Sequence, residues 1–307
     1  MNLLSLLILH SLLLLLLAPL LPGIIAKTKA FFGGRKGAPV LQLYFDLNRL
    51  RRKGMVVSPT TSWIFFVGPL LAVAVPLTAS LMLPFGGLAA PVRFGGDAIL
   101  FVYLFGLLRF FTASAALDTG SAFEGMGAAR EVSFSCLAEP AVLLVLLLLG
   151  RLAGSFSLQQ MLAPQQLAVA WPAQGVTLGL ALVTLLVVVL AENARIPVDD
   201  PNTHLELTMI HEVMVLDHSG PALGLIEYGS ALKLWVLGGL VVQLSLPPLL
   251  PTDLAATTLL FIAGQLLLAL LIGIIESVMA RLPLPRVPAL LIGSGLLAAF
   301  GLILILR

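Results

Sequence analysis

Acidic and histidine side chains gather in one stretch of the sequence, residues 192–229. Seven of the 15 acids of the chain lie there, together with three of its four histidines. Carboxylates inside membrane proteins mark proton relays, and histidine can titrate near neutral pH. This stretch is therefore the first candidate for proton handling. Its acids are Glu192, Asp199, Asp200, Glu206, Glu212, Asp217 and Glu227, and its histidines are His204, His211 and His218.

The three histidines are seven residues apart, on a segment that the sequence predicts to be helical. Thr203 and Glu206 match the capping box that opens a helix, and Gly220-Pro221 is typical of a helix end. A helix over about 204–218 would place the histidines on one stripe, two turns or roughly 10 Å apart. Ligands of one ion need a spacing of three or four residues, which argues against a metal site. A solvated polar face fits this stripe, and so does a proton relay or a partner contact.

Four further ionisable residues lie inside apolar runs. Arg109 is about eight residues, or roughly 12 Å, from the end of its run, and Glu139 is about seven residues into the next run. A buried charge must be paired or hydrated, so we expect interior pairing or a hydrated path for both. Lys233 and Glu276 lie nearer the ends of their runs, where snorkelling to the membrane surface is the simpler expectation.

Other charges flank these runs. Glu192 and Arg195 are three residues apart at an expected helix end, so we predict that they pair. The loop after the run that holds Arg109 is expected to contain Asp118, Glu124 and Glu131. A polar set that carries protons from the cytosol to mid-membrane depth is predicted to consist of Glu139, Glu192, Asp199, Glu206 and Glu227.

The elements that hold these charges are expected to be membrane-spanning helices. The chain has 307 residues, of which 59% are hydrophobic and only 10% charged, and its mean hydropathy is +1.08. A soluble domain carries roughly 25% charged residues. We therefore predict an all-α integral membrane protein, with residues 1–307 forming one polytopic domain. About eight spans of the usual length of roughly 20 residues are expected, at residues 2–26, 60–83, 97–117, 132–152, 173–191, 230–250, 254–279 and 287–306.

The basic residues support this number of spans. Thirteen of the 17 Lys and Arg residues fall on the side of the odd-numbered loops, three fall on the other side, and Arg109 lies within a span. By the positive-inside rule, the N-terminus is expected outside. Lys27 and Lys29 follow the first apolar run and no basic residue precedes it, which favours a retained helix over a cleaved signal peptide.

The first loop, about residues 27–59, is more than a connector. Apolar residues recur at helical spacing over 40–50, and a basic cluster follows. The pattern predicts an amphipathic helix on the cytosolic face of the membrane. It fits a lipid anchor and a docking site for a partner equally well.

The composition limits what the chain can do alone. A single cysteine, Cys136, allows no disulfide or cysteine-ligated cluster within the chain. The net charge of +2 does not suggest nucleic acid as a partner. The sequence contains no nucleophile–base pair, Walker loop or dinucleotide fingerprint. We therefore expect a subunit that carries no cofactor and is not catalytic by itself.

The stretch Glu192–Pro201, ENARIPVDDP, resembles the signature loop of the respiratory complex I subunit 1 family. In that family this subunit joins a hydrophilic redox arm to an antiporter-like membrane arm. The resemblance covers nearly the whole chain and includes Gly34–Pro39 in the basic first loop and Glu227-Tyr228. It implies that Arg195 is the motif arginine, and that the coupling acids are Glu192, Asp199, Glu206 and Glu227.

Within the family, the chain is most similar to the membrane subunit of energy-converting nickel–iron hydrogenases of the formate hydrogenlyase type. The fifth loop carries the His211-Glu212 pair typical of that type, and Phe134-Ser135 stands where the quinone type has Tyr-Glu. Glu139 lies one turn further on, on the face of Ser135, and is our candidate to replace that acid. These departures argue against a quinone pocket.

The resemblance implies an adaptor and proton-translocation subunit that couples electron transfer in a soluble arm to proton movement. Loops 27–59 and 192–229 would dock hydrogenase-like large and small subunits and a ferredoxin-like subunit, which carry iron–sulfur clusters and the nickel–iron site. Antiporter-like subunits would lie beside it in a bacterial or archaeal cytoplasmic membrane. The alternative is the quinone-binding subunit of an NADH, or other donor, quinone oxidoreductase. A stand-alone transporter predicts paired broken helices in two halves, which the sequence lacks.

Overall fold

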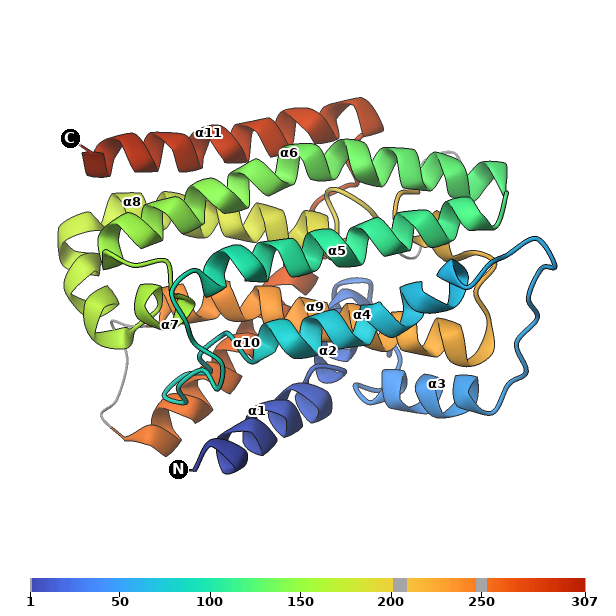
Figure 1. Cartoon of the computed structure of the whole chain (residues 1–307), viewed down its shortest axis with the longest axis horizontal. Coiled ribbons are helices and arrows are strands. Elements are labelled where there is room, and N and C mark those ends of the chain that lie inside the picture. Colours follow the sequence, from blue (N-terminus) through green and yellow to red (C-terminus); the bar gives the residue numbers. More distant parts are fainter. Residues whose placement is uncertain (1, 201–208, 247–252, 307) are drawn as a thin grey trace.

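The structure, a computed structural model of the chain, describes residues 2–200, 209–246 and 253–306. Within these ranges the chain is nearly all helical, and only an isolated bridge pairs Phe85 with Leu88 (Figure 1). The helices are α1 (Leu3–Leu17), α2 (Leu20–Phe32), α3 (Gln42–Arg51), α4 (Ile64–Ser80), α5 (Asp97–Asp118), α6 (Ala122–Ala153), α7 (Leu158–Met161), α8 (Pro164–Glu192), α9 (Gly220–Ser245), α10 (Leu254–Val278) and α11 (Val287–Leu306), with short 3-10 turns at Glu212–Val215 and Leu284–Arg286.

The long helices confirm the expected fold class, an all-α integral membrane protein. In the described part of the chain, seven helical segments are long and apolar enough to cross a membrane, with α1 and α2 counted as one segment. The shorter apolar helix α4, of 17 residues, matches the span predicted at residues 60–83 and completes the set of eight. The chain is therefore a multi-pass membrane protein.

Three of these helices begin earlier than their apolar runs indicate. α6 begins at Ala122 rather than at residue 132, and α8 and α9 begin about nine or ten residues before their predicted starts. Hydropathy misses these turns because each contains polar residues, such as Gln165 in α8 and Glu227 in α9, which lower the local hydropathy. Glu131, expected in a loop, lies within α6 for this reason.

The first predicted span, residues 2–26, is two helices instead of one. They meet at Pro19, which has no N–H to donate to the carbonyl of Leu15 one turn earlier. Tyr228 of α9 donates its hydroxyl to that carbonyl at 2.9 Å. A neighbouring helix thus satisfies the acceptor that the proline leaves free, as is required away from water.

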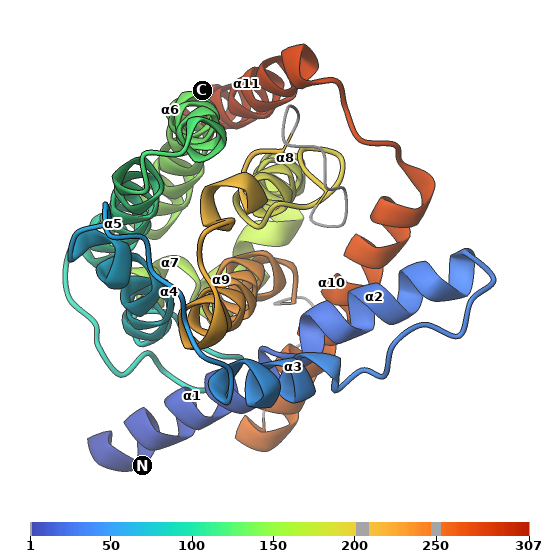
Figure 2. The same ribbon diagram turned by 90° about the vertical axis from the view of Figure 1, so that its right-hand side faces the viewer.

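The helices surround a central pair, α8 and α9 (Figure 2). An arc of α4, α5, α6 and α11 covers one side of this pair, and α10 packs on α2 at the other side. α9 is the most enclosed described span, since 67% of its most apolar window is buried, against at most 44% in the others. At Gly229 a Cβ atom would lie 2.3 Å from the carbonyl oxygen of Ala72 in α4, so only glycine allows this close approach. That contact fixes the position of Lys233, one turn further along α9.

One end of the bundle carries residues 33–63, 193–200 and 209–219, and we call it the basic end (right-hand side of Figure 1). The amphipathic helix predicted over 40–50 is present there as α3, with Arg49 and Arg51 in its last turn. Leu50 is buried beside Gly224 of α9. α3 is therefore packed on the bundle and is more than a free surface segment.

The helix predicted over 204–218 is wrong in the part that the structure describes. Residues 209–211 are not helical, and only the 3-10 turn Glu212–Val215 follows. The reason is Asp199, whose Oδ2 accepts the backbone N–H groups of Ile210 and His211 at 3.2 and 3.1 Å. A side chain takes donors that a helix would use, which favours a loop.

Candidate functional site

Arg109 of α5 is the centre of a buried charged cluster. Its side chain is 10% exposed and donates from Nε to Oε1 of Glu131 at 3.2 Å. Its two terminal nitrogens donate to Glu139 and Glu192. The three carboxylates come from α6 and α8, so one guanidinium ties three helices together. The interior pairing expected for Arg109 and Glu139 is confirmed.

Lys233 of α9 extends this cluster. Its Nζ donates to Oε2 of Glu192 at 2.7 Å, while Oε1 of Glu192 accepts from Arg109. The side chain of Lys233 is only 16% exposed. The expectation that it snorkels to the membrane surface is therefore wrong, because a carboxylate one helix away offers a closer partner than the interface does.

His211 connects the cluster to the loop that follows α8. Its Nε2 lies 3.0 Å from Oε2 of Glu131, and its Nδ1 lies 3.4 Å from Oδ2 of Asp199. Arg281 approaches the other oxygen of Asp199 at 2.9 Å. The contacts therefore connect Glu139, Arg109, Glu131, His211, Asp199 and Arg281 in that order. Glu192 and Lys233 form a branch at Arg109. We call these eight residues the network.

The loop residues of the network have shifted pKa values. Burial lowers the pKa of His211, but the charges of Glu131 and Asp199 outweigh burial and raise it above its ordinary value. Burial raises the pKa of Asp199, but the hydrogen bonds and charge of His211, with the charge of Arg281, hold it below its ordinary value. Both shifts favour a charged His211 between two carboxylates.

A cavity of about 240 Å³ opens beside the network, between α5, α8, α9 and the turn at 212–215. Arg109, Glu131, Glu192, His211 and Lys233 line it, and Glu212 and Glu227 add carboxylates to its wall. Apolar side chains such as Leu108, Met214 and Ile226 line the rest. The cavity thus places Glu212 and Glu227 in one wall with members of the network.

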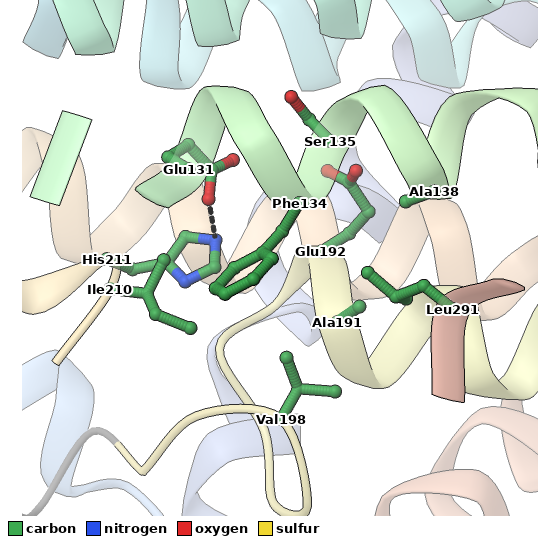
Figure 3. A pocket seen from close by; sticks show the side chains of 10 residues that line it. All are labelled: Glu131, Phe134, Ser135, Ala138, Ala191, Glu192, Val198, Ile210, His211 and Leu291. Atoms are coloured by element: carbon green, nitrogen blue, oxygen red, sulfur yellow. Dashed lines mark ion pairs between the residues drawn. The ribbon is translucent and has the colours of Figure 1, made fainter. Parts of the chain in front are cut away.

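A second, much smaller space lies behind the network, against α6, α8 and α11 (Figure 3). Its volume of about 10 Å³ is close to what one water molecule needs. Figure 3 shows the ring of His211 reaching Glu131, with Ser135 and Glu192 further along the same wall. Ser135 stands where the quinone type carries an acid, and Glu139, one turn on, holds the carboxylate that contacts Arg109.

A separate buried ion cluster lies between α2, α10 and the turn after α8. Glu276 has a fully buried side chain and contacts Lys29 at 2.8 Å and Arg195 at 3.4 Å. The predicted snorkelling of Glu276 is therefore wrong, and so is the predicted pair of Glu192 with Arg195. α8 ends at Glu192 and Ala194 adopts a positive φ of 51°, which turns Arg195 toward α10 instead. We call Lys29, Glu276 and Arg195 the clamp.

The remaining predicted residues lie apart from the network. His218 is buried, stacks on Phe65 with ring centroids 4.0 Å apart, and pairs its Nε2 with the carbonyl of Phe65 at 3.3 Å. It shares no helical stripe with His211. His204 and Glu206, with the capping box, lie outside the described residues. Among the described residues, no group of three or more His, Cys, Asp or Glu is placed to hold a metal ion.

Sequence reasoning missed three members of the network, namely Glu131, Lys233 and Arg281. A signal existed for Glu131, because residues 131, 135 and 139 are four apart and lie on one face of a helix. Lys233 and Arg281 gave no local signal, since their partners are about 40 and 80 residues away.

The arrangement can hold and pass protons. Arginine stays protonated in proteins, so Arg109 sets the charge of its neighbours and does not relay. Carboxylates, an imidazole and water in the cavity can exchange protons, and each step in the network spans 3.4 Å or less. Direct contacts link Asp199, His211 and Glu131, whereas Glu139 and Glu192 connect to Glu131 only through Arg109. Passage of a proton around Arg109 would need water in the cavities that these carboxylates line.

A sequence model of one family, described as NADH dehydrogenase, matches residues 4–306. The chain belongs to the NADH dehydrogenase family. The matched range includes every residue of the network and of the clamp. The match confirms the family resemblance that Glu192–Pro201 suggested.

Two relatives of the chain are named as components of hydrogenase systems. The chain is 34% identical over 276 residues to formate hydrogenlyase subunit 4 of Escherichia coli strain K12, which covers 90% of this chain and 86% of that one. It is also 34% identical over 278 residues to hydrogenase-4 component C of the same strain, at 89% and 86% coverage.

The fold also matches a chain in the solved structure of the membrane-bound sulfane sulfur reductase, an archaeal respiratory membrane complex. The TM-score is 0.78 at 20% identity, over 97% of this chain and 99% of that chain. At this identity the match supports the fold and says nothing by itself of the chemistry.

Proposed function

We propose that this chain is the proton-moving membrane subunit of a complex I-like oxidoreductase of the hydrogenase type. One observation carries the proposal: eight charged or titratable side chains form one connected network, which extends from Asp199 near the basic end to Glu139 on α6. Ionisable side chains inside a membrane are costly, and where they occur they usually serve a function. The family and the two hydrogenase relatives support the same assignment.

The coupling step centres on His211. Electron transfer in a soluble partner would move the loop at 199–211 and change the distances from His211 to Glu131 and Asp199. A weaker contact with either carboxylate lowers the affinity of the imidazole for its proton. The proton would then pass to Glu131 or to water in the cavity, and the carboxylates around Arg109 would take it to membrane depth.

The orientation and partners follow from the same picture. The basic end faces the cytosol, with the N-terminus outside, in the cytoplasmic membrane of a bacterium or archaeon. Loops 27–59 and 192–229 dock hydrogenase-like large and small subunits and a ferredoxin-like subunit. Those partners carry the iron–sulfur clusters and the nickel–iron site, and antiporter-like subunits lie alongside in the membrane.

The test is the number of protons moved per hydrogen molecule by the purified complex in sealed vesicles. Glu192→Gln removes the charge that joins Arg109 to Lys233 and keeps the shape of the side chain. We expect hydrogen turnover to continue while proton movement falls by roughly tenfold or more, since a relay group typically contributes 10²–10⁴-fold. Glu276→Gln is the matched control, because it alters a buried carboxylate outside the network. Full proton movement in Glu192→Gln would contradict the proposal.

The apolar part of the large cavity favours one second candidate, the quinone-binding subunit of a donor:quinone oxidoreductase. Leu108, Met214 and Ile226 offer a surface that a quinone ring could contact. A photoreactive quinone analogue would then label α5 or the 209–219 segment in the intact complex. Absence of labelling at these segments, with labelling of a known quinone enzyme as control, would exclude this candidate.

A further inference from the structure

Glu139 presents a charge to the outside of the bundle at membrane depth. Its side chain is 42% exposed, although α6 is apolar enough to cross a membrane. Glu139 lies 14 residues before the end of α6 at Ala153, or about 21 Å along the helix. That position is inside a hydrocarbon layer of about 30 Å. A carboxylate exposed to lipid at such a depth costs several kcal/mol, so this side chain needs a partner.

The chain itself compensates this charge only in part. The hydrogen bond from Arg109 reaches Oε1 of Glu139, and no described residue donates a hydrogen bond to Oε2. Arg109 also serves Glu131 and Glu192. With His211 charged, the four carboxylates of the network face four positive groups, but Arg109 is the one group among them that contacts Glu139. Glu139 is the most exposed of the three carboxylates on Arg109.

Further polar groups lie on the same outer face. Pro140 has no N–H, so the carbonyl of Cys136 loses its helical donor, and both residues are exposed. On α5, Tyr103 is 71% exposed, and in the described part of the chain no hydrogen bond to its hydroxyl is formed. Gly106, one turn from Tyr103, leaves room beside Oε1 of Glu139. Lipid tails can satisfy none of these groups.

This face also leads inward. A space of about 30 Å³ between α5, α6, α8 and α9 is lined by Arg109, Glu139 and Glu192 among apolar side chains such as Phe105 and Val142. Glu139 therefore stands between the outer face and Glu192 at the interior of the network. A group placed against Glu139 from outside would sense the charge state of the network.

We propose that the α5–α6 face around Glu139 is covered by a membrane-spanning helix of another chain, which brings a basic side chain to Glu139. A basic group can donate charge-assisted hydrogen bonds to Oε2 of Glu139, and it can reach the carbonyl of Cys136. The same contact would let a proton or a change of charge leave this chain at Glu139. The interface rests on exposure and charge alone, whereas its role in proton transfer rests on the proposed function.

The test is photo-crosslinking in the intact complex, in its own membrane. A photoreactive amino acid replaces Leu143, which is 47% exposed and lies one turn from Glu139 on α6. The control replaces Leu296 of α11, which is 65% exposed and lies on a helix without charge in its span. We expect Leu143 to yield an adduct with one protein, and sequencing of the adduct to give an apolar segment that contains Lys, Arg or His. Leu296 should yield chiefly lipid adducts.

A charge variant separates a specific contact from mere proximity. Glu139→Gln keeps the size of the side chain and removes its charge, and we expect the yield of the protein adduct at Leu143 to fall by roughly tenfold or more. Lipid adducts alone at Leu143, a crosslinked segment without a basic residue, or an unchanged yield in Glu139→Gln would each overturn the proposal. The crosslink is measured without turnover, so its failure is distinct from failure of the pumping test.

Discussion

The network and the clamp are both buried clusters of ionic side chains near the basic end, yet they are built differently. In the clamp, one fully buried carboxylate, Glu276, sits between Lys29 and Arg195. In the network, Arg109 alone meets three carboxylates, and Glu131 and Glu192 line an open cavity of about 240 Å³. The clamp has more positive than negative charge around a carboxylate with no exposed surface, whereas two carboxylates of the network line a cavity.

This difference separates a structural role from a proton-handling one. A carboxylate held by two cations and sealed from water has little reason to change its charge. Carboxylates that share one cation and face a cavity can exchange protons at smaller cost. Both clusters consist of carboxylates and basic side chains, so their surroundings distinguish them.

The largest expected effect is on the network. Arg109→Met leaves three carboxylates close together without their shared cation, and breaking a buried ion cluster typically costs about 3–5 kcal/mol. We expect the complex to lose this subunit or to unfold at clearly lower temperature, as measured by thermal unfolding in detergent. Arg109→Lys restores one charge but not three hydrogen bonds, and should lie between the two. If Arg109→Met were as stable as the wild type, the claim that Arg109 holds the network together would be wrong.

A smaller effect is expected in the clamp. Glu276→Gln still accepts hydrogen bonds but leaves two cations without a charge between them, so we expect a loss of about 1–3 kcal/mol in unfolding free energy. Protons moved per hydrogen molecule should stay at the wild-type value in the complexes that assemble. A lowered proton ratio in a fully stable Glu276→Gln complex would erase the distinction between clamp and network.

The smallest expected effect is the pH dependence of the contacts that Asp199 makes with Ile210 and His211. The pKa of His211 is raised above 6.5, so the stabilisation from its charged form is complete below pH 6.5 and is lost as pH rises through the raised value. The pKa of Asp199 is lowered from 3.8, so its contribution is lost only as pH falls through that lowered value. We expect the protection of the Ile210 and His211 amides against hydrogen exchange to decrease on the alkaline side. In His211→Gln this pH dependence should vanish; if it persists, another group controls the loop.

The sequence predicted the class of fold and several of the charged residues of the site, but it did not predict which residues they contact. Apolar runs near 20 residues located every span, and the basic residues of loop one indicated α3. The starts of α6, α8 and α9 were missed because their first turns contain polar residues that lower the local hydropathy. The histidine stripe failed for a similar reason, since Asp199 captures the amides of the segment that local pattern makes helical.

The ion pair predicted from sequence spacing was also wrong, because the actual partners are distant in sequence. Sequence spacing paired Glu192 with Arg195, but the turn at Ala194 sends the arginine to Glu276 and leaves Glu192 to Arg109 and Lys233. Spacing along one helix can predict contacts within that helix only. The network joins residues from four helices and two connecting segments, so its assembly depends on packing that no local pattern encodes.

The most direct measurement of the account is an infrared difference spectrum of the intact complex between its oxidised and hydrogen-reduced states. Protonation changes of carboxylic acids appear there as bands that shift in heavy water. We predict such bands in the wild type and in Glu276→Gln, and their loss or shift in Glu131→Gln and Glu192→Gln. A spectrum with the same carboxyl bands in all four proteins would contradict the claim that the network carries the proton.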